Sequence, residues 1–321
     1  MALPESLEGK LRVPLIGAPM FIVSGPELVI AQCQSGIIGA FPALNARPQS
    51  ALGDWIKQIK NALRAYGEEN PHDPIAPFAV NQIVHASNSR LREDMETCVE
   101  HEVPIIITSL RPPEEVVKAV HSYGGLVFHD VISLRHAQKA IGQGVDGIIA
   151  VCAGAGGHAG PLSPFALVKE IRKNFDGAII LSGCITSGHD VLAARAMGAD
   201  LAYSGTRYIA SEEANAAPEY KEMIVDSSAS DIAYSSLFTG IAGSYLKGSI
   251  ANAGLDPENL PDGSKSDMDF AKASKSDAKA WKDIWGAGQG VGDIDAILPA
   301  REITLNIEQE YRDTLAALVA S

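Results

Sequence analysis

The sequence predicts a (β/α)8 TIM barrel, an α/β fold in which eight parallel strands are each followed by a helix. From residue 12 to about 210, short apolar runs alternate with longer stretches of helical periodicity, and eight such pairs can be counted. The apolar runs are nearly continuous instead of alternating with polar residues, as is typical of parallel strands covered on both faces. These two observations together indicate the barrel.

The eight strands are predicted at 12–18, 36–41, 77–81, 104–109, 125–129, 145–151, 177–182 and 200–204. The helices between them are predicted at 26–35, 50–65, 88–100, 113–122, 133–143, 164–173, 188–197 and 207–216. An open doubly wound sheet is the alternative. Its first βα turn usually carries GxGxxG, whereas this chain has GAPMFIVSGP there, so eight repeats favour closure into a barrel.

The alternation of apolar runs and helical stretches stops after the eighth pair, which predicts that the chain has three parts. We expect the barrel at 1–216, a smaller, mainly helical insertion at 217–300, and a C-terminal helix at 301–321 that returns to the barrel. The insertion includes a polar, Asp-, Ser- and Lys-rich stretch at 261–283, which we expect to be partly helical and loosely held.

Composition excludes several classes of function. The chain has 321 residues, of which 46% are hydrophobic and 20% charged, enough apolar surface for a sizeable core. A net charge of -13 repels nucleic acid and anionic lipid surfaces. The sequence has no secretion signal and no apolar run of membrane-spanning length, so a cytoplasmic protein is expected. Four widely spaced cysteines suggest neither a metal site nor disulfides.

In a (β/α)8 barrel the active site lies at the carboxyl ends of the strands, and phosphate is often bound after strands seven and eight. Those positions here hold Gly183 and the pair Gly205–Thr206. Glycine lets backbone N–H groups approach an anion, and a following helix adds the positive end of its dipole. The alternative is that these glycines only turn strand into helix.

His158 lies in the loop CAGAGGHAG after strand six, which is too rich in glycine to pack as ordinary core. We expect its imidazole at the barrel mouth, where a pKa near neutrality suits proton transfer or anion binding. The alternative is a loop histidine that only forms a structural hydrogen bond. No histidine spacing indicates a metal site.

Together these strand ends resemble the nitronate monooxygenase family, formerly called 2-nitropropane dioxygenases. The resemblance covers most of the chain and rests on APM (18–20), PFAVN (77–81), AGGHAG (155–160), SGCITSG (182–188), GADLAYSGTRYIASEE (198–213) and WGAGQGVG (285–292). It implies a TIM barrel with FMN as cofactor and His158 as the active-site histidine. It also implies cofactor contacts from Ala18, Met20, Asn81, His129, Gly157, Gly183, Gly205, Thr206, Gly288 and Gln289.

The chain departs from the family pattern close to the histidine. Before AGGH the family commonly has a polar residue, a glycine and an acidic residue, where this chain has Val151, Cys152 and Gly154. After strand seven, Gly183–Cys184 replaces the usual pair of glycines. These positions bear on substrate contacts, while backbone groups preserve the phosphate site.

The resemblance implies oxidation of alkyl nitronates with O2 to carbonyl compounds and nitrite. His158 would either bind the anionic nitro oxygens or accept a proton from a neutral nitroalkane. One alternative is an FMN-dependent enoyl-acyl-carrier-protein or quinone reductase that uses NADH or NADPH. Another is a flavin- or phosphate-binding barrel without catalysis. The expected partners are therefore small molecules, and the oligomeric state stays open, with a homodimer among the choices.

Overall fold

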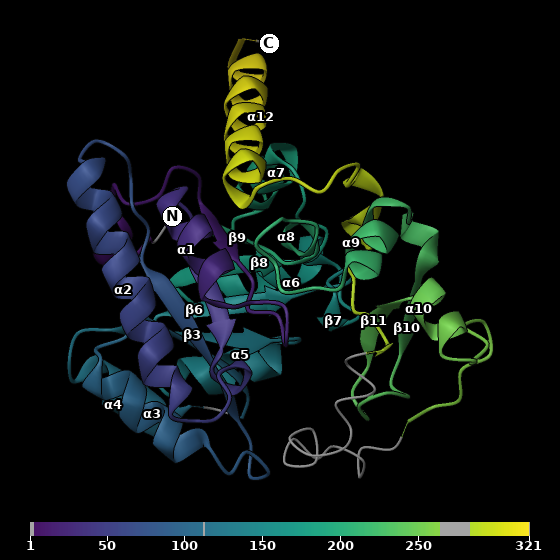
Figure 1. Ribbon diagram of the computed structural model, residues 1–321, viewed down its shortest axis with the longest axis horizontal. Helices are drawn as coiled ribbons and strands as arrows, with labels where there is room; N and C mark the ends of the chain where they lie inside the picture. Colours follow the sequence, from purple (N-terminus) through teal and green to yellow (C-terminus); the bar gives the residue numbers. More distant parts are fainter. Residues whose placement is uncertain (1–2, 112, 264–282, 321) are drawn as a thin grey trace.

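Eight parallel strands form a ring in the computed structural model, which describes residues 3–111, 113–263 and 283–320 (Figure 1). The strands are β1 (Leu15–Gly17), β2 (Gly39–Pro42), β3 (Phe78–Val84), β4 (Ile105–Leu110), β5 (Leu126–Val131), β6 (Gly147–Val151), β8 (Ala178–Ser182) and β9 (Leu201–Ser204). Their order is β1-β9-β8-β6-β5-β4-β3-β2. The Gly17 N–H donates to the Ile38 carbonyl, 2.7 Å away, and links β1 to the chain entering β2. The predicted TIM barrel is confirmed.

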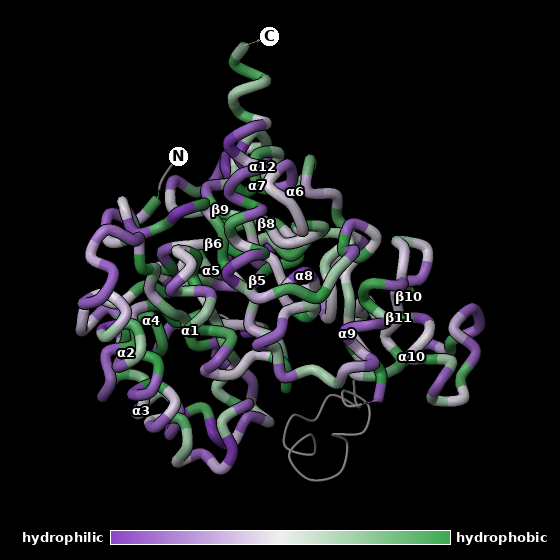
Figure 2. Tube along the Cα trace, turned by 45° about the horizontal axis from the view of Figure 1, so that its top comes forward, coloured by the Kyte–Doolittle hydropathy of each residue, from purple (hydrophilic) through white to green (hydrophobic). Residues whose placement is uncertain are grey.

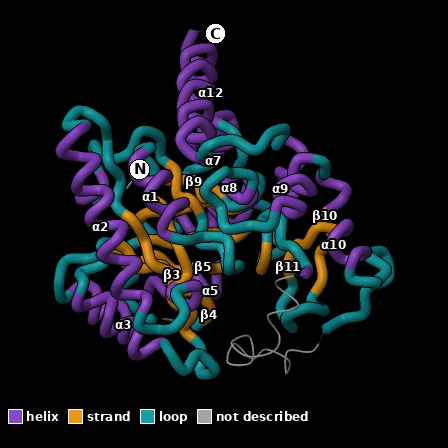
Figure 3. The backbone as a smooth tube through the Cα atoms, in the orientation of Figure 1, coloured by secondary structure: helices purple, strands orange, loops and turns teal. Residues whose placement is uncertain are grey.

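Helices surround these strands (Figure 3). They are α1 (Pro26–Gln34), α2 (Ala51–Glu69), α3 (Leu91–Glu100), α4 (Glu114–His121), α5 (Leu134–Ile141), α6 (Pro164–Arg172), α7 (Gly188–Ala196) and α8 (Thr206–Ile209). Each lies within a predicted range or within a few residues of one. Among the described residues, no helix combines the length and apolar character needed to cross a membrane.

The helix α8 is much shorter than the predicted 207–216. The chain after it pairs with the segment that precedes the last helix: the Glu212 N–H donates to the Leu298 carbonyl, and the Leu298 N–H donates to the Ala210 carbonyl. These bonds satisfy backbone groups that a longer helix would have paired internally. A tertiary contact therefore ends the helix.

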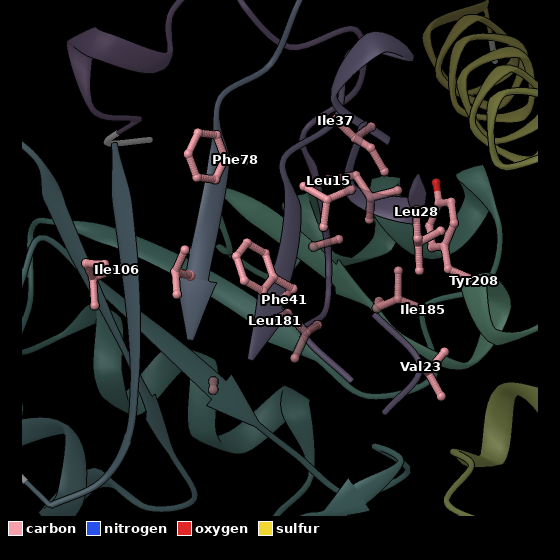
Figure 4. Packing of buried hydrophobic residues seen from close by; sticks show 14 of the residues in the cluster. Leu15, Val23, Leu28, Ile37, Phe41, Phe78, Ile106, Leu181, Ile185 and Tyr208 are labelled. Atoms are coloured by element: carbon pink, nitrogen blue, oxygen red, sulfur yellow. The ribbon is translucent and has the colours of Figure 1, made fainter. Parts of the chain in front are cut away.

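Two hydrophobic cores follow from the two faces of the strands. The inner core fills the barrel and includes Ile16, Ile107, Phe128 and Ile180, with Leu7 packed into the same cluster. The outer core lies between strands and helices, and Figure 4 shows part of it around Phe41, Leu181 and Tyr208. Since both faces are buried, the strands need apolar residues at odd and even positions alike.

Between residues 217 and 300 the chain forms α9 (Pro218–Val225), β10 (Ile232–Ser235), β11 (Gly243–Leu246), α10 (Lys247–Asn252) and the 3-10 helix η6 (Gln289–Asp293). These elements lie beside the barrel in Figure 1. The two strands were not predicted from the sequence. Most of the polar stretch at 261–283 lies outside the described residues, and the division at 216 and 300 stays a prediction.

The strand β11 joins the insertion to the barrel. It pairs with β10 on one side and, on the other, with β7 (Gly157–His158), which lies in the loop after β6. In this antiparallel pairing Gly243 is opposite His158. The loop that carries the predicted active-site histidine is thus a strand of a second sheet.

The last helix, α12 (Ala300–Ala320), packs its first half on α7 and α1 and buries Ile303 and Ile307. Its second half projects beyond the barrel and ends on Leu318 and Val319, which are exposed (Figure 2). The structure therefore has a helix over most of the predicted 301–321, but only the first half of that helix covers the barrel.

Replacing Gly188 with alanine should destabilise the protein, because α7 touches α12 at this residue. A β-carbon at Gly188 would lie 2.2 Å from the Tyr311 backbone nitrogen and 2.3 Å from the Ile307 carbonyl oxygen. Overpacking of this kind costs about 1–3 kcal/mol. Urea unfolding measures the loss.

Gly142→Ala is the matched control. Its backbone is helical, with φ of -62°, and a β-carbon there would come no closer than 3.4 Å to the Gln138 carbonyl. We expect it to be neutral or stabilising by about 0.4–1 kcal/mol. Equal losses in both variants would show that the α7–α12 contact is not tight.

Candidate functional site

The loops after β1 and β9 lie against each other at the carboxyl ends of the strands. A β-carbon at Gly205 would be 3.5 Å from the Ala18 β-carbon and 3.6 Å from the Met20 sulfur. Asn45 fixes the β1 loop, since its Nδ2 donates to the carbonyls of Met20 and Ser24 at 3.0 and 2.9 Å. The structure thus brings three of the predicted site residues together.

Gly183 lies against the loop after β6. Its φ is +135°, and a β-carbon would be 2.9 Å from the Ala153 carbonyl oxygen, so a side chain is excluded on two grounds. Next to it, Cys184 also has a positive φ, of 54°, and its Sγ donates to the Gly154 carbonyl oxygen at 3.7 Å. The departures Gly154 and Cys184 are therefore in direct contact.

The insertion closes over these loops through residues 288 and 289. The Gly288 N–H donates to the Thr206 Oγ1, and the Gln289 N–H donates to the Gly154 carbonyl, both at 2.9 Å. A β-carbon at Gly288 would be 2.6 Å from the Gly154 carbonyl oxygen. The two backbones meet because residue 288 has no side chain, while Gly154 needs glycine for another reason, since its φ is +88° and a β-carbon would lie 2.4 Å from the Cys184 sulfur.

The expected helix dipole after strand seven is not available to a ligand. The N–H groups of Thr186 and Ser187 both donate to the Asp190 carboxylate at 2.9 Å. The Gly188 N–H donates to the Glu310 carboxylate at 2.8 Å. Because two carboxylates of the chain already occupy this helix start, an anion would have to be held by the glycine backbone alone.

His158 is half-buried, and its ring contacts the insertion. Its Nε2 lies 2.7 Å from the Thr239 Oγ1, and that hydroxyl donates to the Ile241 carbonyl. Burial lowers the pKa of His158 to about 4, so the imidazole is neutral near pH 7.

His129 does not join this group. Its strand neighbours Val127 and Val131 lie in the outer core, and its Nδ1 is 2.8 Å from the Thr108 Oγ1. Burial, with a smaller effect of His136 on α5, lowers its pKa to about 4. The structure places this side chain between the barrel and its helices and not at the mouth.

The strand-five residue that faces the mouth is Asp130, which the sequence reasoning missed. Its Oδ2 accepts from the Ser109 hydroxyl at 2.6 Å, and the Ser109 Oγ accepts from the Asn81 Nδ2 at 2.9 Å. Burial raises the pKa of Asp130 to about 6, against the lowering effect of the Ser109 bond. These hydrogen bonds link three side chains on β3, β4 and β5. Of the three, only Asn81 was predicted as a site residue.

A family model described as nitronate monooxygenase matches residues 6–310. The nitronate monooxygenase of Paraburkholderia phytofirmans is 25% identical over an alignment that covers 95% of this chain and 94% of that protein. A Mycobacterium tuberculosis protein, a monooxygenase by name, is 28% identical over 73% of this chain, and the match spans only 66% of that protein.

Solved structures share the whole fold. The nitroalkane oxidase of Streptomyces ansochromogenes superposes on this chain with a TM-score of 0.79 at 19% sequence identity. The superposition covers 98% of this chain and 100% of that one. FabK of Thermotoga maritima gives 0.76, covering 97% and 96%, at 24% identity. At these identities the likeness concerns the fold.

Thr206→Val should loosen the contact between barrel and insertion, because it leaves the Gly288 N–H without its acceptor. An unsatisfied buried donor costs about 1–3 kcal/mol. Hydrogen exchange should show faster exchange at residues 286–293. Thr206→Ser keeps the hydroxyl and should keep the protection, and unchanged exchange in the valine variant would contradict the role of this bond.

Proposed function

The chain belongs to the nitronate monooxygenase family and is a flavin-dependent oxidoreductase, and we propose that it holds FMN and oxidises alkyl nitronates or nitroalkanes with O2 to carbonyl compounds and nitrite. The observation that carries the proposal is the convergence of glycine loops and a neutral His158 at one end of the barrel. When bound, the flavin supplies the electron transfer.

The residues at the mouth fit a flavin. Gly183 and Gly205 directly follow the neighbouring strands β8 and β9 and carry no side chain that would keep a phosphate from the backbone. The Asp130 Oδ1 is buried without a partner among the described residues, as expected beside a polar ligand. The remaining proposed contacts are Ala18, Met20, Asn81, Gly157, Thr206, Gly288 and Gln289.

The state of His158 favours one of its two predicted roles. Because the ring is neutral near pH 7, it carries no positive charge to attract an anionic nitro oxygen, and it is in the form that can accept a proton. We therefore assign His158 the removal of the proton next to the nitro group of a neutral nitroalkane. Thr239 positions the ring for that transfer.

Purified protein tests the function directly. We expect a yellow protein that releases FMN on denaturation and that consumes O2 and forms nitrite when a nitronate is added. Anaerobic mixing with NADH or NADPH is the discriminating control, because bleaching of the flavin band by either would favour the reductase alternative. A protein that takes up no flavin would overturn both enzyme proposals.

His158→Ala should discriminate between two forms of one substrate. With nitroethane, loss of the base should lower kcat/KM by about 10²- to 10⁴-fold. With ethyl nitronate, which has already lost that proton, the loss should be much smaller. Retained FMN content serves as the folding control, and equal losses with both forms would reject the base role.

The pH dependence follows from the lowered pKa of His158. Because that pKa is about 4, the ring is in its basic form throughout pH 5–8 and loses it only as the pH falls through 4. A plot of kcat/KM for nitroethane against pH should therefore show no inflection near pH 6.5 that depends on His158. The profiles of the wild type and of His158→Ala should have the same shape in that region. Such an inflection would mean that the ring is solvated in the working enzyme.

A further inference from the structure

Asp130 faces the interior of the barrel at its mouth. Leu126 and Phe128 pack in the inner core, and the intervening Val127 lies in the outer one, so the alternation along β5 directs Asp130 inward. The bond from Ser109 and the link from Ser109 to Asn81 place the carboxyl beside a predicted cofactor contact.

One oxygen of this carboxyl is unsatisfied. The Oδ1 is buried and has no hydrogen-bond partner among the described residues, while the Oδ2 is bound by Ser109. A buried carboxylate oxygen without a donor costs free energy, and proteins keep such a group where a ligand or a reaction uses it. The position of Oδ1 at the mouth points to a ligand.

The surroundings offer no compensating charge. Within the described ranges, no lysine, arginine or histidine forms an ion pair with Asp130. The side chains that interact with it are Ser109 on β4, which also binds Asn81 on β3, and Tyr203 on β9. Of these, only Tyr203 titrates, and burial together with the charge of Asp130 raises its pKa, so it is a neutral phenol near pH 7.

We propose that Asp130 is a contact of the bound flavin, with Oδ1 hydrogen-bonded to the polar edge of the flavin ring and the carboxyl charge controlling how readily the ring accepts electrons. This inference rests on the proposed flavin-dependent function and adds a residue to its site. A carboxylate beside the ring disfavours the negative charge that reduction adds, whereas the protonated acid does not.

The pH dependence has a definite sign. The pKa of Asp130 is raised to about 6, so the carboxyl is charged above that pH and neutral below it. The flavin should consequently be harder to reduce above pH 6 than in a variant that lacks the charge. The difference should disappear as the pH falls through 6.

Asp130→Asn is the test, because asparagine keeps the size of the side chain and an oxygen that accepts from Ser109. FMN-loaded wild type and variant are reduced anaerobically with dithionite against a reference dye from pH 5 to 8. At pH 8 we expect the equilibrium constant for reduction to be about tenfold higher in the variant. At pH 5 the two proteins should agree.

Ser109→Ala is a second variant with an independent expectation. It removes the bond that lowers the pKa of Asp130 but keeps the carboxyl, so the pH at which the charge effect disappears should move upward. The inference would be overturned if wild type and Asp130→Asn both bind FMN and their flavins are equally easy to reduce from pH 5 to 8. Absence of FMN binding would overturn it as well.

Nitrite formation from ethyl nitronate, measured on the same preparations, keeps the two proposals distinguishable. A protein that forms nitrite but whose flavin does not respond to Asp130→Asn retains the proposed function and loses this contact. A protein whose flavin responds as expected but that forms no nitrite retains the contact and loses the proposed substrate.

Discussion

Closure of the strand ring at β1 is the constraint on which the rest of the structure depends. This strand has only three residues, yet it bonds to β9 along its length and to the chain entering β2. Closure brings the carboxyl ends of all eight strands to one rim. Met20 and Gly205, which are far apart in the sequence, become neighbours as a result. An open sheet would have separated the first of these loops from the last.

The sequence was sufficient for the position of each barrel strand but not for the direction of its side chains. Strands buried on both faces have no polar alternation from which to read the inward positions. His129 and Asp130 are adjacent in such a strand, and family resemblance favoured the histidine, whereas the structure turns the aspartate inward. The pairing of β7 with β11 was equally inaccessible, because it joins segments about 85 residues apart through backbone bonds that leave no local pattern. The glycine loops were predictable because close backbone contact needs that residue type.

Burial shifts the pKa of both ionisable side chains at the barrel mouth, His158 and Asp130. Burial lowers the pKa of His158 and raises that of Asp130, so each group moves toward its neutral form. Near neutral pH the mouth therefore holds a neutral imidazole and the negative charge of Asp130, which is lost as the pH falls through 6. Groups of this kind respond strongly to a ligand that brings charge, since little solvent is present to screen it. Burial, more than pairing with opposite charges, therefore sets the pKa values of these two side chains.

The second sheet has a consequence for how such a protein can change. Two of its strands, β10 and the central β11, belong to the insertion, while the other outer strand, β7, carries the imidazole, which Thr239 of the insertion contacts. A substitution in the insertion is thereby transmitted to His158 without passing through the barrel. The position of His158 depends on residues 239–246 of the insertion through the β7–β11 pairing and the Thr239 contact. The barrel strands hold one another in place, whereas the position of the histidine loop is fixed partly by residues 243–244 of the insertion.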